Sequence, residues 1–108
     1  MDNKWGGILE HGSEIQGEIS FQGDSKIAGR VIGKIFSDSE VYISETAVIT
    51  GDIKAKVIIV FGQIEGTLIA EKRIEIRKNA KFKGKINSPS LVVDEGVRFE
   101  AEASTHSL

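Results

Sequence analysis

The apolar positions along the chain repeat one short phrase, apolar-x-Gly-x-apolar. The phrase occurs six times, with alanine in place of glycine in the last copy, at residues 15–19, 27–31, 49–53, 64–68, 82–86 and 99–103. From Ile49 onward its first apolar residue advances by 15, 18 and 17 positions. A period of this length predicts a solenoid, in which each coil buries its apolar face against the neighbouring coils.

A second apolar ladder runs between these phrases. It consists of apolar-x-apolar pairs that begin at Ile19, Val41, Val57, Ile74 and Leu91, and after Val41 its spacing is 16, 17 and 17 residues. Strict alternation places one face of each short strand toward the inside. No segment carries a helical apolar repeat with a cap, so helix is expected to be nearly absent. The two ladders predict an all-β, single-domain β-helix of triangular section, with about five to six coils of ~17 residues.

The glycine of each phrase has two explanations. Alternation places it on the inner side of a corner, where little room is left for a side chain, or it supplies a bend with positive φ. Ala101 takes the place of the glycine in the last phrase. Because alanine avoids positive φ, this residue favours lack of space as the explanation.

Composition narrows the class of protein. The 108 residues suffice for one domain with a moderate core, and the formal charge of -2 gives no general reason to expect nucleic acid as a partner. Without cysteine, disulfides, thiolate metal sites and thiol catalysis are excluded. The sequence has neither a signal peptide nor an apolar run of membrane-spanning length, so we expect a soluble cytoplasmic protein.

Charged residues fall into columns when the coils are stacked. One column contains Thr50, Glu65, Lys83 and Glu100, and the next contains Asp52, Thr67, Lys85 and Glu102. The basic run at 72–85 is therefore interleaved with acidic residues of other coils. We expect cross-strand charge pairing on a solvated face, with a patch for anionic lipid or for a partner as the alternative. No aromatic residues interleave with the lysines, so nucleic acid is not expected.

Outward positions of the second ladder are less polar. They include Tyr42, Ile58, Val60 and Val92, because only the odd-numbered residues of 57–61 are expected to face the core. Apolar residues in one solvated neighbourhood suggest a lateral contact surface. The alternative is that residues of high β-propensity simply occupy exposed strand positions.

Longer motifs carry a resemblance to a known family. They are Phe21-x-Gly23-Asp24-x-x-Ile27-x-Gly29-Arg30-Val31-x-Gly33-Lys34-Ile35, Gly51-Asp52-Ile53-x-Ala55, Val60-x-Gly62-x-Ile64-x-Gly66, Gly84-Lys85-Ile86 and Ser88-Pro89-Ser90-Leu91-Val92-Val93-Asp94-Glu95-Gly96-Val97-x-Phe99. Any one of them would be weak. Their order and spacing, and the closing segment, together resemble the bactofilins, which are bacterial polymer-forming cytoskeletal proteins.

The resemblance implies a right-handed β-helix at residues 12–101, between flexible tails at 1–11 and 102–108. It implies assembly end to end, without a nucleotide, into non-polar filaments on the inner membrane that scaffold cell-shape, peptidoglycan or other envelope-building proteins. The aromatic residue that matches Phe99 contributes to the polymer contact in the family, so Phe99→Arg is expected to block assembly. Two departures are Ala101 and the start Met1-Asp2-Asn3-Lys4-Trp5, which replaces a short apolar membrane motif.

The ends of a β-helix also favour assembly on physical grounds. Each end exposes backbone N–H and C=O groups and an open apolar cross-section, which monomeric solenoids cover with a cap. No helix is expected here to supply a cap, so we expect another copy to cover each end. The candidate interface residues are Phe99, Val97, Ala101, Ile15 and Phe21. Polarity stays open on these grounds, because head-to-tail stacking is polar and isologous contacts are non-polar.

The first residues offer a further contact. Trp5, Ile8 and Leu9, beside Lys4, could enter a membrane interface, where the many tails of one filament would act together. They could equally cap the first coil. The two interpretations stay open.

Neither a catalytic constellation nor a cofactor site stands out. His11 and His106 lie near opposite chain ends, which suits neither a triad nor a zinc site within one molecule, and no phosphate loop precedes a helix. We therefore expect no enzyme activity, cofactor or nucleotide. The main alternative is a left-handed hexapeptide β-helix, as in acyltransferases, which would need a stricter apolar repeat and a mid-coil histidine. A passive ice- or saccharide-binding β-helix would need more threonine at coil spacing than Thr50 and Thr67.

Overall fold

Ten β-strands make up the described part of the chain. The computed structural model describes the backbone of residues 7–104 and the side chains of residues 8–97. Within this span no helix occurs, as the two strand ladders predicted. The strands are β1 (Gly7–Leu9), β2 (Glu14–Phe21), β3 (Ser25–Ile27), β4 (Arg30–Ser37), β5 (Glu40–Ile43), β6 (Val48–Val60), β7 (Gln63–Ile76), β8 (Lys81–Asn87), β9 (Leu91–Val93) and β10 (Arg98–Ser104).

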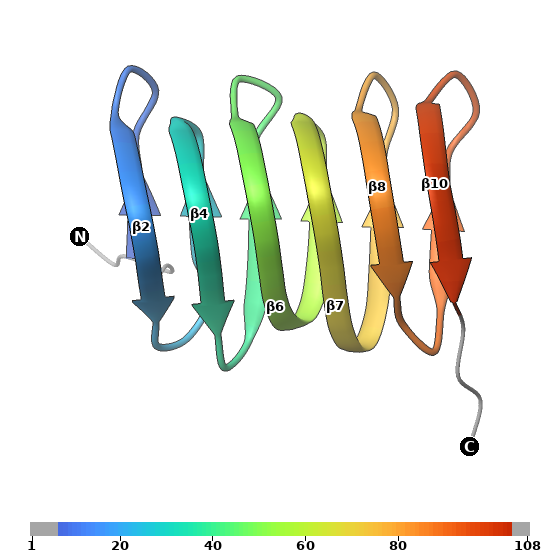
Figure 1. Cartoon of the computed structure of the whole chain (residues 1–108), viewed down its shortest axis with the longest axis horizontal. Coiled ribbons are helices and arrows are strands. Elements are labelled where there is room, and N and C mark those ends of the chain that lie inside the picture. Colours follow the sequence, from blue (N-terminus) through green and yellow to red (C-terminus); the bar gives the residue numbers. More distant parts are fainter. Residues whose placement is uncertain (1–6, 105–108) are drawn as a thin grey trace.

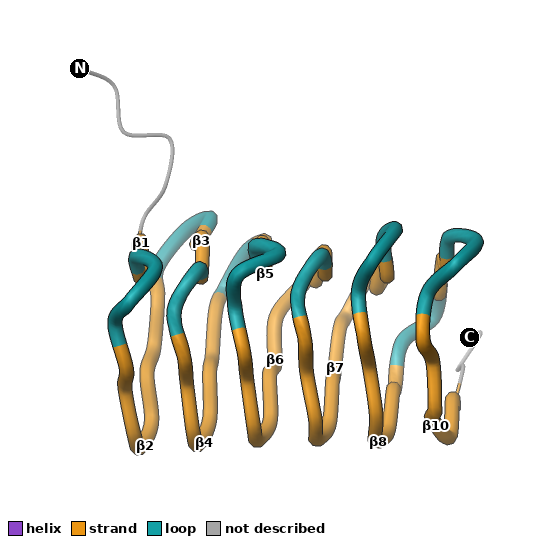
Figure 2. Tube along the Cα trace, turned by 90° about the horizontal axis from the view of Figure 1, so that it is seen from above, coloured by secondary structure: helices purple, strands orange, loops and turns teal. Residues whose placement is uncertain are grey.

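The strands wind into a parallel β-solenoid with two rows. The front row in Figure 1 is β2, β4, β6, β7, β8 and β10. The back row is β1, β3, β5, the second halves of β6 and β7, and β9. β6 and β7, with 13 and 14 residues, pass from one row to the other and join both into a single 10-stranded sheet. Figure 2 shows the coils from above, stacked along one axis. The all-β solenoid is confirmed, whereas its right-handed winding and triangular section stay predictions.

Glycines of the front row stack in register from coil to coil. The column is Gly17, Gly33, Gly51, Gly66, Gly84 and Ala101. Successive members are 16, 18, 15, 18 and 17 residues apart, which gives about five turns. The register predicted from Ile49 onward is therefore confirmed.

The phrase at 27–31 is not a member of this column. The coil between Gly17 and Gly51 instead contributes Val31-Ile32-Gly33-Lys34-Ile35, which overlaps the expected phrase at Val31. Both segments satisfy the pattern apolar-x-Gly-x-apolar, so spacing alone does not distinguish them. The pairing of Gly33 with glycines on both sides does.

The predicted inward residues of the back row are wrong by one position in the second half of β6, although they are right at Val41 and Ile43 and at Ile74 and Ile76. A register shift between Ala55 and Val57, where β6 leaves the front row, reverses the alternation of the following residues. Ile58 and Val60 are consequently fully buried, and Ile59 takes the half-exposed position. Ile58 and Val60 therefore do not belong to a lateral contact surface.

The first member of the back row also differs from the expectation. Ile19 belongs to β2 in the front row, where it pairs with Ile35. The back row continues instead into β3, where Ser25 and Ile27 lie in register with Val41 and Ile43.

Inward side chains form continuous columns between the two rows. In one of them Ile35, Ile53, Leu68 and Ile86 are at most 1% exposed. Removing each such side chain from water stabilises the fold by roughly 1.5–3 kcal/mol. The core therefore runs along the whole axis of the solenoid.

Both explanations of the phrase glycine hold at Gly51. Its φ is 138°, a backbone conformation that residues with a side chain rarely adopt. A Cβ atom at this position would also lie 1.7 Å from the carbonyl oxygen of Gly33 in the preceding coil. The obstacle is the backbone of the neighbouring coil, so glycine allows the coils to stack closely.

The solenoid extends past both expected boundaries. β1 lies within the expected N-terminal tail and pairs with β3, and Leu9 joins the core with 8% of its surface exposed. At the other end β10 pairs with β8 as far as Ser104.

Candidate assembly surfaces at the two ends of the solenoid

Strands at both ends of the solenoid have a partner on one side only. Among the described strands, β1 pairs with β3 and β2 with β4, while β9 pairs with β7 and β10 with β8. Figure 1 shows β2 and β10 as the outermost strands of the front row. Each leaves one edge of backbone N–H and C=O groups open, which is a template for pairing with another chain.

The first coil exposes apolar side chains that the inner coils bury. Ile15 is partly exposed although its register partners Val31 and Ile49 are 0% and 1% exposed. Ile19 and Phe21 of the same strand are also only partly buried against the core. Ile15 and Phe21 were candidates from the sequence, whereas Ile19 was not, although it forms one apolar pair with Phe21.

The last coil shows the same property more strongly. Val93 occupies the inward column that contains Val60 and Ile76, both 0% exposed, yet 42% of Val93 is exposed. Leu91 and Val97 are only partly buried against the core. The sequence predicted Val97 and missed Leu91 and Val93, although both stand last in the back-row ladder.

The remaining predicted interface residues lie in β10. Phe99 pairs in register with Phe82, and Ala101 with Gly84. Their backbone therefore continues two columns of the solenoid at its C-terminal end. Their side chains lie outside the described range.

The glycine column is open at the N-terminal end. A Cβ atom at Gly33 would lie 2.0 Å from the carbonyl oxygen of Gly17, in the preceding coil. At Gly17 itself, with φ 116°, a Cβ atom would meet nothing within 4 Å. The space that a preceding coil fills elsewhere is therefore open beside Gly17, so a further strand has room to approach.

The residues of the predicted membrane contact differ in their exposure. Lys4 and Trp5 lie outside the described residues. Ile8 is 46% exposed, whereas Leu9 is buried in the first coil. Leu9 thus belongs to the core, and the exposed Ile8 can make a contact outside it.

On the back row, Tyr42 and Val92 are the lateral candidates that still face outward. The Tyr42 ring packs against that of Phe61 with centroids 5.1 Å apart, and Val92 is 41% exposed. Between them in the same column lies Glu75, which is 7% exposed. Ion pairs to Arg73 and Arg77 neutralise this carboxylate.

The titratable groups of the described residues assemble no metal site. His11 is exposed and lies in a shallow depression with Glu14 and Arg30, while His106 lies outside the described residues. In the part of the chain that the structure describes, no cluster of His, Asp and Glu could hold a metal ion. The same part contains no helix long and apolar enough to cross a membrane.

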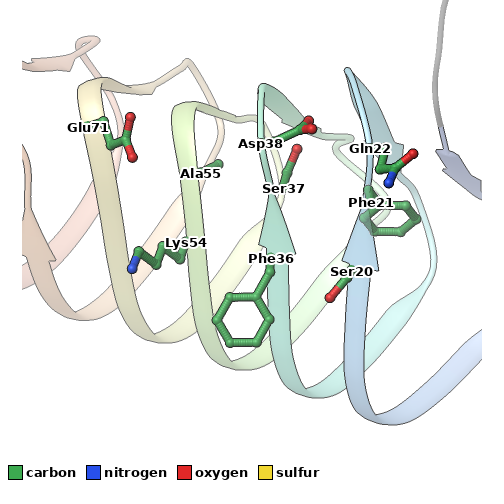
Figure 3. Close-up of a pocket in the computed structure, with 9 residues that line it drawn as sticks. All are labelled: Ser20, Phe21, Gln22, Phe36, Ser37, Asp38, Lys54, Ala55 and Glu71. Atoms are coloured by element: carbon green, nitrogen blue, oxygen red, sulfur yellow. The ribbon is translucent and has the colours of Figure 1, made fainter.

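A groove crosses the bend between the two rows (Figure 3). Phe21 and Phe36 supply its apolar surface, and Asp38, Lys54 and Glu71 supply charges from three coils. Asp38 accepts a hydrogen bond of 2.6 Å from the backbone amide of Gly23, so this carboxylate helps to shape the bend.

Comparisons with known proteins agree with this architecture. A family model, Bactofilin, described as polymer-forming cytoskeletal, matches residues 7–104. Bactofilin BacO of Myxococcus xanthus (strain DK1622) is 29% identical over 86 residues, which cover 80% of this chain and 68% of BacO. Bactofilin BacP of the same organism is 24% identical over 85 residues, which cover 79% of this chain and 35% of BacP. No solved structure matches the chain.

The matched span coincides with the solenoid from β1 to β10. The matching family is structural and polymer-forming, not enzymatic. With a stacked parallel solenoid, two open ends and a family match over nearly its whole length, this chain belongs to the bactofilin family of polymer-forming cytoskeletal proteins.

Proposed function

We propose that the chain builds filaments by stacking copies through the two open ends of the solenoid, without a nucleotide. The observation that carries the proposal is the exposure of Val93 in a column whose inner members are fully buried. A second copy would bury this surface and pair the open strand edges at the same time.

The expected contact at each end is apolar and backbone-directed. Ile15, Ile19 and Phe21 face it at the N-terminal end, and Leu91, Val93 and Val97 face it at the C-terminal end. Burying the exposed part of each side chain contributes about 1 kcal/mol. Phe99 and Ala101 lie at register positions of the same C-terminal edge.

A non-polar filament is the arrangement that family membership favours. It requires two isologous contacts, one between N-terminal ends and one between C-terminal ends. A head-to-tail filament requires a single contact between unlike ends. The two arrangements predict different oligomeric states for a variant in which one end is blocked.

Blocking one end tests the proposal and its polarity. Val93→Arg blocks the C-terminal end, and Ile15→Arg blocks the N-terminal end, because each places a charge in an apolar contact. In a non-polar filament each variant stops at a dimer of the 11.7 kDa chain. In a head-to-tail filament each variant alone stays a monomer, and mixing the two gives a heterodimer. Light scattering coupled to size exclusion measures the mass.

A matched control exists in the neighbouring residue. Val92 is 41% exposed, like Val93, but faces sideways and not along the axis. Val92→Arg is therefore expected to keep single filaments. Phe99→Arg is expected to act like Val93→Arg. Unchanged filaments from a folded Val93→Arg protein would refute assembly through this end.

Lateral association of filaments is assigned to the back row. Tyr42 and Val92 face outward there, and charge substitutions at these positions are expected to abolish bundles while single filaments persist. Loss of the filaments themselves would contradict this assignment.

The filaments are further proposed to lie at the inner face of the cytoplasmic membrane and to position cell-shape, peptidoglycan or other envelope-building proteins. Family membership supports this role, and the exposed Ile8 beside the N-terminal residues supports a membrane contact. Because Leu9 belongs to the core, the test removes residues 1–6 only. Undiminished binding of this shortened chain to liposomes, with Ile8→Ser added, would exclude the N-terminal anchor.

A further inference from the structure

The groove at the first bends of the solenoid has an aromatic wall that the described residues leave uncovered. Phe36 is 38% exposed, although its strand β4 has a neighbouring strand on either side. Phe21 of β2 lines the same groove and is only partly buried against the core. Figure 3 shows the two rings on neighbouring coils. The groove has a volume of about 380 Å³, near the lower end of the usual range for binding sites.

Hydrogen bonds between the first two bends hold the groove in shape. The backbone amide of Gly23 donates a hydrogen bond of 2.6 Å to Asp38 in the next coil. The Ser37 hydroxyl donates one of 3.2 Å to the carbonyl oxygen of Gly23, and the Ser39 hydroxyl donates one of 2.5 Å to Asp24. The groove is therefore already formed in the folded chain, and an occupant does not have to reorganise it.

The residues that precede β1 lie within reach of this groove. β1 begins at Gly7, which is in parallel register with Ser25 of β3. Directly before Ser25 the chain forms the first bend, where Gln22 lines the groove. Because β1 and β3 run in the same direction, the chain before Gly7 arrives from the side of this bend. Neighbouring strands lie about 4.8 Å apart, and Trp5 is separated from Gly7 by at most about 7 Å of extended chain.

The chemistry of these residues matches the groove. Trp5 is directly preceded by Lys4 in the sequence. The lining of the groove includes the carboxylates of Asp38 and Glu71 and one ammonium group, that of Lys54. An indole ring packs favourably against other aromatic rings, and its N–H needs an acceptor such as a carboxylate. An adjacent lysine adds a charge that complements the acidic rim.

We propose that Trp5 docks in the groove of its own chain, against Phe21 and Phe36. The short connection to β1 gives the side chain a high effective concentration at this site. A docked Trp5 is not available to a membrane, so the groove and the membrane compete for it. Docking itself does not depend on filaments, whereas the competition rests on the membrane contact of the proposed function.

Other occupants fit the groove less well. The phosphates of a nucleic acid would face the carboxylates of Asp38 and Glu71. Trp5 of a second copy has the same chemistry but lacks the connection to β1, so it would fill the groove only at concentrations where chains associate. The dependence of docking on concentration therefore distinguishes the two sources of Trp5.

The test uses the fluorescence of Trp5, which is the single tryptophan of the chain. Emission and quenching by acrylamide are recorded for the full chain without vesicles, at concentrations where light scattering shows no assembly. Phe36→Ser removes the exposed wall of the groove. The control is Ile32→Ser, because Ile32 lies in the same strand, is 41% exposed and does not line the groove. Circular dichroism checks that each variant is folded.

The wild type and the control are expected to emit at short wavelength and to resist quenching. Phe36→Ser is expected to weaken docking roughly tenfold or more, because an aromatic contact and its buried area are lost. Its emission then moves to longer wavelength and its quenching increases. Solvent-exposed emission from the wild type, or unchanged protection in Phe36→Ser, would overturn the proposal. Protection that fades on further dilution would overturn it in favour of a second copy.

Flotation with vesicles of phosphatidylcholine and phosphatidylglycerol tests the competition. Phe36→Ser is expected to bind these vesicles several-fold more strongly than the wild type, because Trp5 is released, and Ile32→Ser is expected to bind like the wild type. Adding Trp5→Ser to Phe36→Ser is expected to remove the gain. Weaker binding of Phe36→Ser would overturn the competition. Vesicle binding by none of these proteins would contradict the proposed membrane contact, while the fluorescence without vesicles decides docking separately.

Discussion

Ile76 and Val93 are register partners in one inward column, one coil apart, but Ile76 is fully buried and Val93 is 42% exposed. Their side chains are similar, and both point toward the axis of the solenoid. The difference is that Ile76 has a coil on either side, whereas Val93 has a coil on one side only. Exposure at the ends is therefore a property of the stack and not of the residue.

The same contrast holds at the other end. Ile19 is partly exposed, and Ile35, in register with it one coil further on, is 0% exposed. The inner coils of the solenoid pack against a coil on each side, whereas each end coil packs on one side only. Another copy can therefore complete the packing of an end coil. Matched substitutions at an inner residue and at its register partner in an end coil therefore separate effects on folding stability from effects on assembly.

The largest difference is expected between Gly51→Ala and Gly17→Ala. Both glycines have positive φ, so conformational strain affects both variants. Only at Gly51 does the new methyl group meet the backbone of a preceding coil, at 1.7 Å. Gly51→Ala is expected to lower the free energy of unfolding by more than about 4 kcal/mol, and Gly17→Ala by about 1–2 kcal/mol.

Urea unfolding followed by circular dichroism, at concentrations where the chain is monomeric, measures this difference. Gly17→Ala is also expected to weaken assembly, because its methyl group projects into the space where another copy approaches. Equal destabilisation by the two variants would contradict the close stacking of the glycine column.

Ile53→Ala and Ile19→Ala make the same change in one column of the core. Ile53 is 0% exposed between two coils, so its truncation leaves a cavity and is expected to cost about 3 kcal/mol of unfolding free energy. Ile19→Ala is expected to cost the monomer less than half as much. Its main effect is expected on assembly, seen as a higher protein concentration needed for light scattering to rise. A loss of stability at Ile19 as large as that at Ile53 would mean that the first coil is already covered.

Arg77→Ala is expected to have the smallest effect on stability. Arg77 pairs with the buried Glu75 and also with Asp94 at 3.3 Å, which connects the last coil to the one before it. Glu75 keeps Arg73 as a partner, and Arg77 is 36% exposed, so a cost of about 1 kcal/mol is expected. Local opening of the last coil, measured by hydrogen exchange of β9, is expected to increase. Unchanged protection of β9 would show that the ion pair does not hold this coil in place.

The sequence predicted the period of the solenoid well where apolar and polar residues alternate. It predicted the register of 49–53, 64–68, 82–86 and 99–103 correctly. It failed at 57–61, because this run is apolar throughout and does not reveal the register shift after Ala55. It also failed at Val31, where two overlapping phrases satisfy the same pattern and only pairing distinguishes them.

The end surfaces were predictable only in part. Ile15, Phe21 and Val97 were identified because they lie near the chain ends of the ladders, and the structure places all three at the ends of the core. Their part in assembly stays a prediction.

Electron microscopy of the purified full chain, without nucleotide, tests end-to-end assembly most directly when Val93→Arg and Val92→Arg are imaged beside the wild type. Both variants add the same charge to neighbouring, equally exposed residues of β9. We expect thin filaments from the wild type and from Val92→Arg, and none from a still-folded Val93→Arg protein. Filaments in all three samples, or a monodisperse monomer in all three, would contradict assembly through the open C-terminal end.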